Sequence, residues 1–127
     1  MIYGVGTDVV EIARIEQALE RFGERFARRI LCAPELERFR RHRLPANYLA
    51  KRFAAKEAFT KALGTGIHAP ANWHGIWVVN LKSGKPELRF SEPLKALLEQ
   101  RRIAQTHLSL TDERGMAAAT VILESAA

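Results

Sequence analysis

Two acidic residues and one lysine are the residues of this chain best suited to carry chemistry. Asp8 follows a short apolar segment, and Glu57 lies four residues before Lys61 in an alanine-rich stretch. Mg²⁺ prefers hard oxygen ligands, is commonly held by one or two carboxylates, and completes its coordination with water and substrate phosphate. Lysine supplies a mobile positive charge for phosphate oxygens. These residue types together predict a magnesium site that handles a phosphate.

Each of these residues also has a simpler interpretation. Asp8 is a suitable N-cap for a helix that begins near Val9. Glu57 and Lys61 have the spacing and order of an ordinary ion pair on a helix surface. The small alanines around Glu57 instead favour close packing of its helix against another element. A carboxylate held there is either paired or bound to a metal.

The other polar residues form no second catalytic motif. Cys32 is the only cysteine, which excludes an intrachain disulfide and a multi-cysteine zinc site. His42, His68 and His74 show no metal-ligand spacing with one another or with Cys32. The glycine-rich phosphate-binding loops of nucleotide-binding proteins are also missing.

Positive charge is concentrated in one part of the chain. The sequence has 20 Lys and Arg against 14 Asp and Glu, a net charge of +6. Residues 11–56 hold twelve basic and six acidic residues, whereas the rest of the chain holds eight of each. Such a segment attracts phosphates or an acidic protein surface. The alternative is a solvated basic face without a partner.

Length and composition favour one globular domain over residues 1–127. The chain is 47% hydrophobic and 27% charged, which excludes disorder, collagen and coiled coil. The N-terminus lacks the features of a secretion signal, and no apolar run approaches membrane length. We therefore expect a soluble cytoplasmic protein without a membrane partner.

The spacing of apolar residues predicts the elements that position the candidate residues. In the first half we expect a strand over 2–5, a helix over 12–22 that ends or kinks at Gly23, and a long helix over 48–63, with a second apolar and basic stretch over 25–31. Asn47 is the expected N-cap of the long helix and Gly64 its C-terminal stop. In the second half we expect strands over 76–79, 87–90, 107–110 and 117–123, with a helix after Ser91. This order predicts an α+β fold, with an antiparallel sheet packed on helices.

Three segments of the sequence together resemble one enzyme family. They are residues 4–12 with their Gly-x-Asp, residues 52–64 with the pattern F-x-x-K-E-A-x-x-K-A, and residues 107–122. In this order, and over nearly the whole chain, they resemble the holo-acyl-carrier-protein synthases, the small class of phosphopantetheinyl transferases.

The resemblance implies a reaction on coenzyme A. In this family coenzyme A binds with its pyrophosphate on Mg²⁺, and a serine hydroxyl of acyl carrier protein attacks the phosphate that bears the pantetheine arm. Adenosine 3',5'-bisphosphate leaves, and the holo carrier serves fatty acid biosynthesis. Asp8 and Glu57 match the family's metal ligands, and Lys61 matches its catalytic lysine. The base that takes the serine proton stays open between Glu57 and a metal-bound water.

The resemblance also implies binding surfaces and an assembly. The residues that match the family's coenzyme A pocket are Arg52, Lys61, Gly84, Lys85, Pro86 and His107. Carrier proteins are acidic, so the expected docking residues are Arg14, Arg21, Arg25 and Arg28, provided that Gly23 does not break their common face. The family forms homotrimers with active sites between subunits. Many relatives have a histidine in place of Asp112, to which we assign no role.

Two other functions fit the sequence less well. A basic nucleic-acid-binding module explains the charge. Its stacking aromatic residues would lie among the basic residues, however, whereas Trp73 and Trp77 lie outside the basic segment. A metal-dependent nuclease usually places its acid and lysine two residues apart on a strand, whereas Glu57 and Lys61 are four apart on an expected helix. We therefore expect no nucleic-acid partner.

Overall fold

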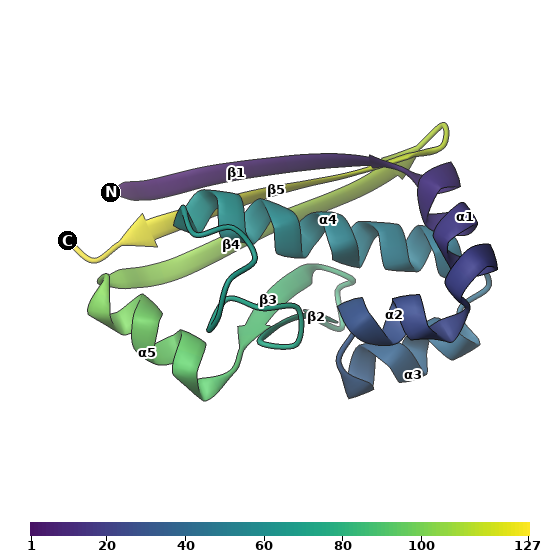
Figure 1. Cartoon of the computed structure of the whole chain (residues 1–127). Coiled ribbons are helices and arrows are strands. Elements are labelled where there is room, and N and C mark those ends of the chain that lie inside the picture. The colour runs from purple at the N-terminus through teal and green to yellow at the C-terminus, as the bar shows by residue number, and fades with distance from the viewer.

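A three-stranded antiparallel sheet and one long helix run alongside each other through the molecule (Figure 1). The computed structural model describes residues 1–127 and places the strands in the order β1–β5–β4. These strands are β1 (Ile2–Glu11), β4 (Ile103–Glu113) and β5 (Met116–Ser125), and the long helix is α4 (Pro45–Leu63). The expected α+β fold with an antiparallel sheet packed on helices is confirmed.

Three short helices cover one end of α4. They are α1 (Ile12–Phe22), α2 (Glu24–Ile30) and α3 (Ala33–Arg41). Gly23 separates the first two with a φ of 64°, a value that glycine adopts without strain. Apolar side chains such as Ile15, Ile30 and Leu49 pack these helices on α4 in one buried cluster.

The other side of α4 carries a hairpin and a last helix. The hairpin consists of β2 (Ile76–Asn80) and β3 (Pro86–Phe90), which pair as a separate antiparallel sheet. The helix is α5 (Glu92–Gln100), and the Leu94 N–H donates to Ser91 Oγ at 3.4 Å, which confirms Ser91 as its N-cap. Phe59 of α4 lies in the core that these elements share with β5.

Strand β1 lies directly on the backbone of α4. A Cβ atom on Gly4 would lie 2.0 Å from the Ala62 carbonyl oxygen, and one on Gly6 would lie 1.9 Å from that of Ala58. No side chain fits in that space, so the contact requires glycine on the strand. Close packing of the alanine-rich helix against another element is therefore confirmed.

Three expected boundaries are wrong. The first strand does not end at Gly6–Asp8 but continues to Glu11, so Asp8 lies inside β1 and caps no helix. Helix α4 begins at Pro45, and the Asn47 side chain donates to Asp112 Oδ2 at 3.1 Å instead of capping it. Strands β4 and β5 are longer than expected, with only residues 114–115 between them. Gly64 does end α4, with a left-handed φ of 89°.

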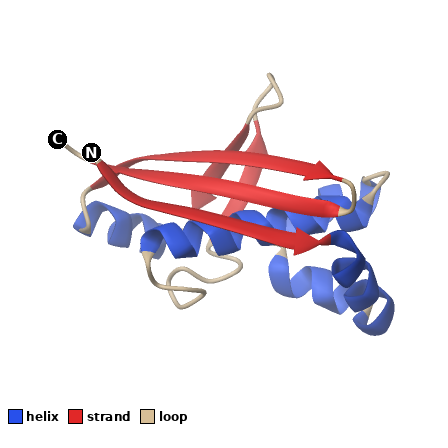
Figure 2. Ribbon diagram, turned by 90° about the horizontal axis from the view of Figure 1, so that it is seen from above, coloured by secondary structure: helices blue, strands red, loops and turns tan.

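One face of the large sheet carries no helix (Figure 2). Val5, Ile122 and His107 are cross-strand partners in one row, and Val9, Ala118 and Thr111 form another. Directly paired residues share a face, and these rows point away from α4. Val5 and Val9 are 55% and 60% exposed, which is unusual for valine in a strand. No helix of the structure has the length and apolar character needed to cross a bilayer.

A candidate active site between β1 and α4

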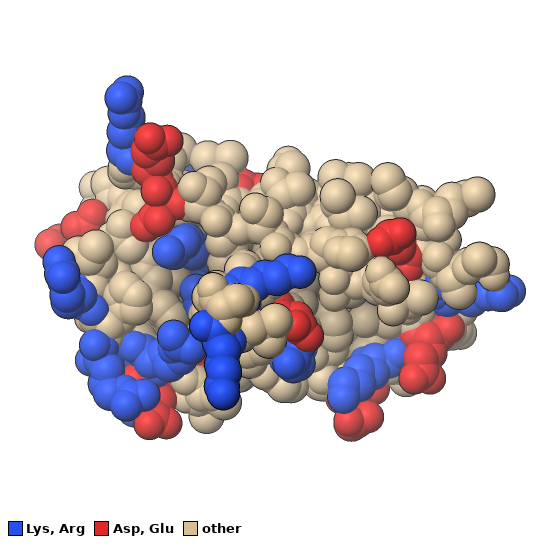
Figure 3. All heavy atoms as spheres, turned by 180° about the vertical axis from the view of Figure 1, so that it is seen from behind, with Lys and Arg blue, Asp and Glu red and all other residues tan.

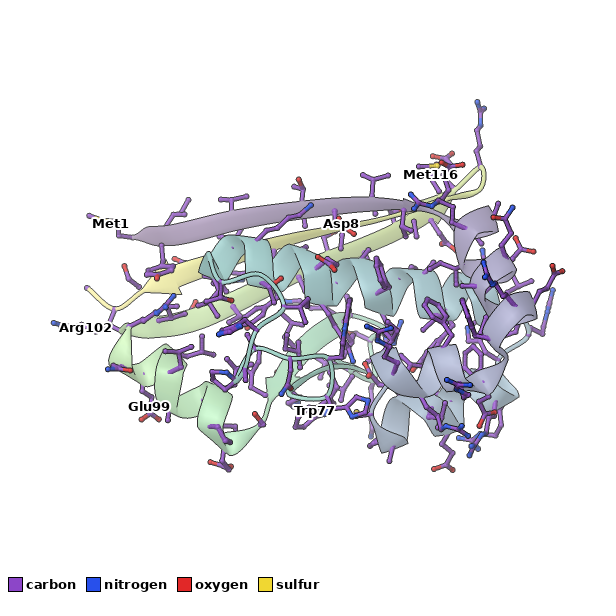
Figure 4. The ribbon with its side chains drawn as sticks, in the orientation of Figure 1. Met1, Asp8, Trp77, Glu99, Arg102 and Met116 are labelled. Carbon is purple, nitrogen blue, oxygen red and sulfur yellow. The ribbon has the colours of Figure 1, made fainter.

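The three candidate catalytic residues meet where β1 crosses α4. Asp8 points from β1 toward the helix (Figure 4), and the Lys61 ammonium donates to Asp8 Oδ1 and to the Thr7 carbonyl oxygen, each at 3.0 Å. Glu57 lies one helical turn before Lys61 and lines the same cavity as Asp8, of about 490 Å³. Lys61 pairs with Asp8 and not with Glu57, so the ordinary Glu57–Lys61 ion pair is wrong.

The charge balance of this cavity favours a cation. The Glu57 carboxylate has no hydrogen-bond partner, and burial raises its pKa above the ordinary value of 4.5. The negative charge of Asp8 raises the pKa of Glu57 further, and Lys61 lowers it by a smaller amount. Two carboxylates therefore share one ammonium, and a bound cation would relieve their repulsion.

The donor set fits magnesium better than zinc. No group of three or more His, Cys, Asp or Glu side chains lies close enough to cage a metal ion. Structural zinc sites need four protein ligands and catalytic zinc sites three, whereas Mg²⁺ is commonly bound by one or two carboxylates together with water and phosphate oxygens. Asp8 and Glu57 supply two hard oxygen donors beside an open cavity. The residues present therefore match Mg²⁺.

The same cavity has an apolar wall and a further positive charge. Arg14 of α1 lines it together with Ile15, Phe26 and Phe53. The Phe53 ring stacks on Trp73 with 5.2 Å between the centroids, which holds that wall in place. The cavity thus offers a charged end for a phosphate and an apolar surface for the rest of a ligand. It also brings Arg14, one of the expected docking residues, beside the carboxylates.

Apart from Lys61, the residues expected to bind coenzyme A lie elsewhere, in two separate cavities. Arg52 and Gly84 line one of about 420 Å³. Lys85, Pro86 and His107 line the other, of about 340 Å³, where β3 meets β4. Neither cavity is lined by Asp8, Glu57 or Lys61. Within one chain, the expected site is therefore divided into three parts.

The Arg52 cavity contains buried donors without partners. Arg52 is only 4% exposed, and its guanidinium lies 4.1 Å from the centroid of the Tyr48 ring. One of its nitrogens, Nη2, donates to Asn80 Oδ1 at 2.7 Å, but Arg52 Nε and the Tyr48 hydroxyl have no partner. Burial lowers the pKa of Arg52. Unpaired buried donors are costly, and an anion in this cavity would satisfy them.

The expected docking arginines do not form one continuous line. Arg14 and Arg21 lie on α1, whereas Gly23 breaks the helix and places Arg25 and Arg28 on α2. Arg28 lies 3.8 Å from Glu24, and the Arg21 guanidinium lies over the Phe22 ring. Lys and Arg side chains still gather at the end of the molecule where α1, α2 and α3 lie (Figure 3).

Sequence reasoning misjudged the burial of two basic residues and missed Tyr48 and Asn80 of the Arg52 cavity. Lys56 and Arg52 were expected within the basic surface segment, but both are buried. The burial of Lys56 has a signal in the sequence, because Ala54, Ala55 and Ala58 flank it and small apolar residues mark the packed face of a helix. Tyr48 and Asn80 carry no such signal, since only the tertiary fold brings them to Arg52.

Comparisons with known proteins agree with this architecture. Residues 4–121 match the model of the 4'-phosphopantetheinyl transferase superfamily. The chain is 53% identical over 125 residues to a holo-[acyl-carrier-protein] synthase of Azoarcus sp. (strain BH72), covering 98% of this chain and 99% of the relative. Among solved structures, it is similar to the holo-[acyl-carrier-protein] synthase of Neisseria meningitidis, with 45% identity, a TM-score of 0.95 and coverage of 98% and 100%. It is also similar to a holo-(acyl-carrier-protein) synthase of Bacillus anthracis in complex with CoA (3',5'-ADP), with 37% identity, a TM-score of 0.82 and coverage of 99% of both chains.

The expected fold, the observed architecture and a nearly full-length match to the family model thus agree. The chain belongs to the holo-[acyl-carrier-protein] synthases, enzymes of the 4'-phosphopantetheinyl transferase superfamily.

Proposed function

We propose that the chain transfers the 4'-phosphopantetheine group of coenzyme A to a serine of apo acyl carrier protein and requires Mg²⁺. The observation that carries this proposal is a cavity lined by both Asp8 and Glu57, with the Lys61 ammonium bound to Asp8. The family supports the reaction, and the Bacillus anthracis relative in complex with CoA supports the donor. One domain over residues 1–127 carries the whole activity in this proposal.

The chemistry divides among few groups. Asp8 and Glu57 would hold Mg²⁺, which when bound neutralises charge on the pyrophosphate of coenzyme A. The serine oxygen forms a bond to the phosphorus that bears the pantetheine arm, and the bond from this phosphorus to the oxygen of adenosine 3',5'-bisphosphate breaks. Lys61 lies beside Asp8 and neutralises charge that develops on the phosphate. The serine proton passes to Glu57 or to a water molecule in the cavity, and the choice between them stays open.

Coenzyme A is long enough to need more than this cavity. We assign its remaining phosphate and its nucleotide to the cavities of Arg52 with Gly84 and of Lys85, Pro86 and His107. The unpartnered donors of Arg52 and Tyr48 support an anion in the first, and the Lys85 side chain supports one in the second, where His107 faces Glu124. Lys61 would contact the pyrophosphate.

The two faces of the large sheet support an active site between subunits. Asp8 pairs with Ala119, which is buried beneath the sheet, whereas His107 pairs with Ile122 on the open face. A single chain therefore presents Asp8 and His107 in different directions, and a neighbouring chain would supply the missing part. The exposed side chains of Val5 and Val9 support an interface on the open face. We propose a homotrimer of this kind.

The carrier and its location complete the proposal. Arg14, Arg21, Arg25 and Arg28 lie on neighbouring helices at the basic end, which supports docking of an acidic carrier protein there. Fatty acid biosynthesis in the cytoplasm is the proposed setting.

Mass spectrometry of the carrier tests the function directly. The purified chain is incubated with apo acyl carrier protein, coenzyme A and Mg²⁺, and the carrier is then weighed. We expect its mass to rise by one phosphopantetheine group, with release of adenosine 3',5'-bisphosphate. The same mixture with EDTA should show no change, and added Mg²⁺ should restore the reaction. An unmodified carrier with excess Mg²⁺ overturns the proposal.

A further inference from the structure

A fully buried ion pair lies beneath the candidate active site, and no step of the proposed reaction uses it. Lys56 precedes Glu57 in α4 and is 0% exposed, with its Nζ 2.7 Å from Glu35 Oε1. The same ammonium donates to the carbonyl oxygens of Ile30 at 2.6 Å and Trp73 at 2.8 Å. An ammonium has three donors, so all of them are used inside the protein.

Glu35 connects the buried ion pair to further segments. Its Oε1 accepts from the Cys32 N–H at 3.2 Å, at the start of α3. Its Oε2 accepts from the Val78 N–H at 2.9 Å, in the middle of β2. Ile30 is the last residue of α2. One ion pair therefore joins α4 to α2, to α3, to the segment before β2 and to the β2–β3 hairpin.

Stability alone does not account for such a pair. The desolvation of two buried charges offsets their attraction, and well-packed apolar side chains of similar volume often stabilise a fold equally well. Apolar contacts, however, have no preferred direction, whereas each hydrogen bond fixes one atom at a defined distance and angle. The segments joined here carry Glu57 on α4, Arg25 on α2, and Gly84 and Lys85 on the hairpin.

We propose that Lys56 is a positioning residue for the transfer reaction. Together with Glu35 it fixes the hairpin that carries Gly84 and Lys85, and helix α2, relative to Glu57. The pair touches neither coenzyme A nor carrier, and it acts through the segments that it holds. This inference rests on the proposed function, because it assigns those segments to the binding of the two substrates.

A neutral double variant tests the proposal. In Lys56→Met with Glu35→Gln both charges are removed, and the glutamine amide keeps an acceptor for the Val78 N–H. Replacement of a buried pair is often tolerated, so we expect a folded protein, with a lower melting temperature because the carbonyl oxygens of Ile30 and Trp73 lose their donor. We expect kcat to fall by about tenfold or more, because small misplacements of reacting groups are costly. The rise in melting temperature on addition of Mg²⁺ should persist, since Asp8 and Glu57 are held by β1 and α4.

A shorter side chain provides a second test that retains the charges. Glu35→Asp removes one methylene, so the segments bound to this carboxylate must move closer to keep their hydrogen bonds. We expect kcat to fall by about threefold or more. Ile103→Val is the matched control, because it removes one methylene from a buried site at the far end of the sheet. It should leave kcat per folded molecule unchanged at a similar loss of stability.

The outcomes separate this inference from the function on which it rests. If the wild type does not modify the carrier, the proposed function is wrong. If the wild type is active and both variants keep the wild-type kcat and KM per folded molecule, Lys56 and Glu35 are purely structural. If the double variant does not fold, Glu35→Asp decides between the two roles by the same criterion.

Discussion

At the scale of single residues, Glu57 shows the cost of holding a carboxylate ready for a metal. Burial raises the pKa of Glu57 in the folded protein above the ordinary value of 4.5. The folded state therefore loses stability as the pH rises from the unfolded pKa to the folded pKa. Above the folded pKa this cost is fully present. We predict that Glu57→Gln raises the melting temperature of the metal-free protein at pH 7 and abolishes transfer.

The response to Mg²⁺ completes this prediction. The ion should raise the melting temperature of the wild type, because it binds only the folded state, and should have much less effect on Glu57→Gln. Glu99→Gln, at an exposed position of α5, is the control and should behave like the wild type. A variant that keeps near-normal turnover at low Mg²⁺ would show that Glu57 is no ligand.

Lys61 differs from Glu57 because its partner is already present. It donates to Asp8, yet its side chain is half-exposed and free to move toward a phosphate. If it stabilises charge that develops during transfer, Lys61→Ala should lower kcat by about 100-fold and change the KM for coenzyme A much less. Steady-state kinetics at saturating carrier distinguish an effect on kcat from an effect on the KM for coenzyme A. An effect on KM alone would make Lys61 a binding residue.

At the scale of elements, the contact between β1 and α4 sets the geometry of the site. A methyl group on Gly6 would lie 1.9 Å from a backbone oxygen of α4, which no side-chain movement relieves. We predict that Gly6→Ala destabilises the protein by about 3 kcal/mol through overpacking and weakens Mg²⁺ binding by separating Asp8 from Glu57. Urea unfolding and the Mg²⁺-dependent shift in melting temperature measure the two effects. Thr7→Ala, on the outward face of the same strand, should change neither by much; equal effects of both substitutions would contradict this account.

The elements also show what the sequence can and cannot predict. Helix α4 and its end at Gly64 follow from local composition and backbone freedom. The extension of β1 through Asp8 does not, because glycines weaken a strand locally and are favoured here only by contact with α4. The pairing of Lys61 with Asp8 and of Lys56 with Glu35 joins residues far apart in the chain. Such contacts depend on tertiary packing, which periodicity does not encode.

At the scale of the whole molecule, the division of the site between two faces of the sheet has a direct test. Asp8→Asn and His107→Ala should each impair transfer when they are the only chains present. If the site lies between subunits, a mixture of the two forms some interfaces with both wild-type groups. Random assembly of a closed ring with head-to-tail contacts predicts about a quarter of the wild-type activity. A mixture that is no more active than its components would place the whole site in one chain.

The basic end of the molecule separates carrier docking from a solvated surface. Arg21 and Arg25 lie on α1 and α2 away from the Asp8 cavity, whereas Arg14 lines it. Reversal of Arg21 and Arg25 to glutamate should raise the KM for an acidic carrier by about tenfold at low salt, through lost attraction and new repulsion. The effect should shrink at high salt, since exposed charges are screened over about 10 Å at 0.1 M. The KM for coenzyme A should hardly move.

A matched control gives this last prediction its meaning. Lys95→Glu with Arg102→Glu makes the same change in net charge in and just after α5, away from the basic helices α1 and α2. If long-range attraction by the net charge were responsible, both double variants would weaken carrier binding equally. If the carrier docks on α1 and α2, only the first variant raises its KM. Should the Arg21 and Arg25 variant match the wild type at low salt, these arginines form a solvated face, and the carrier must contact another part of the molecule.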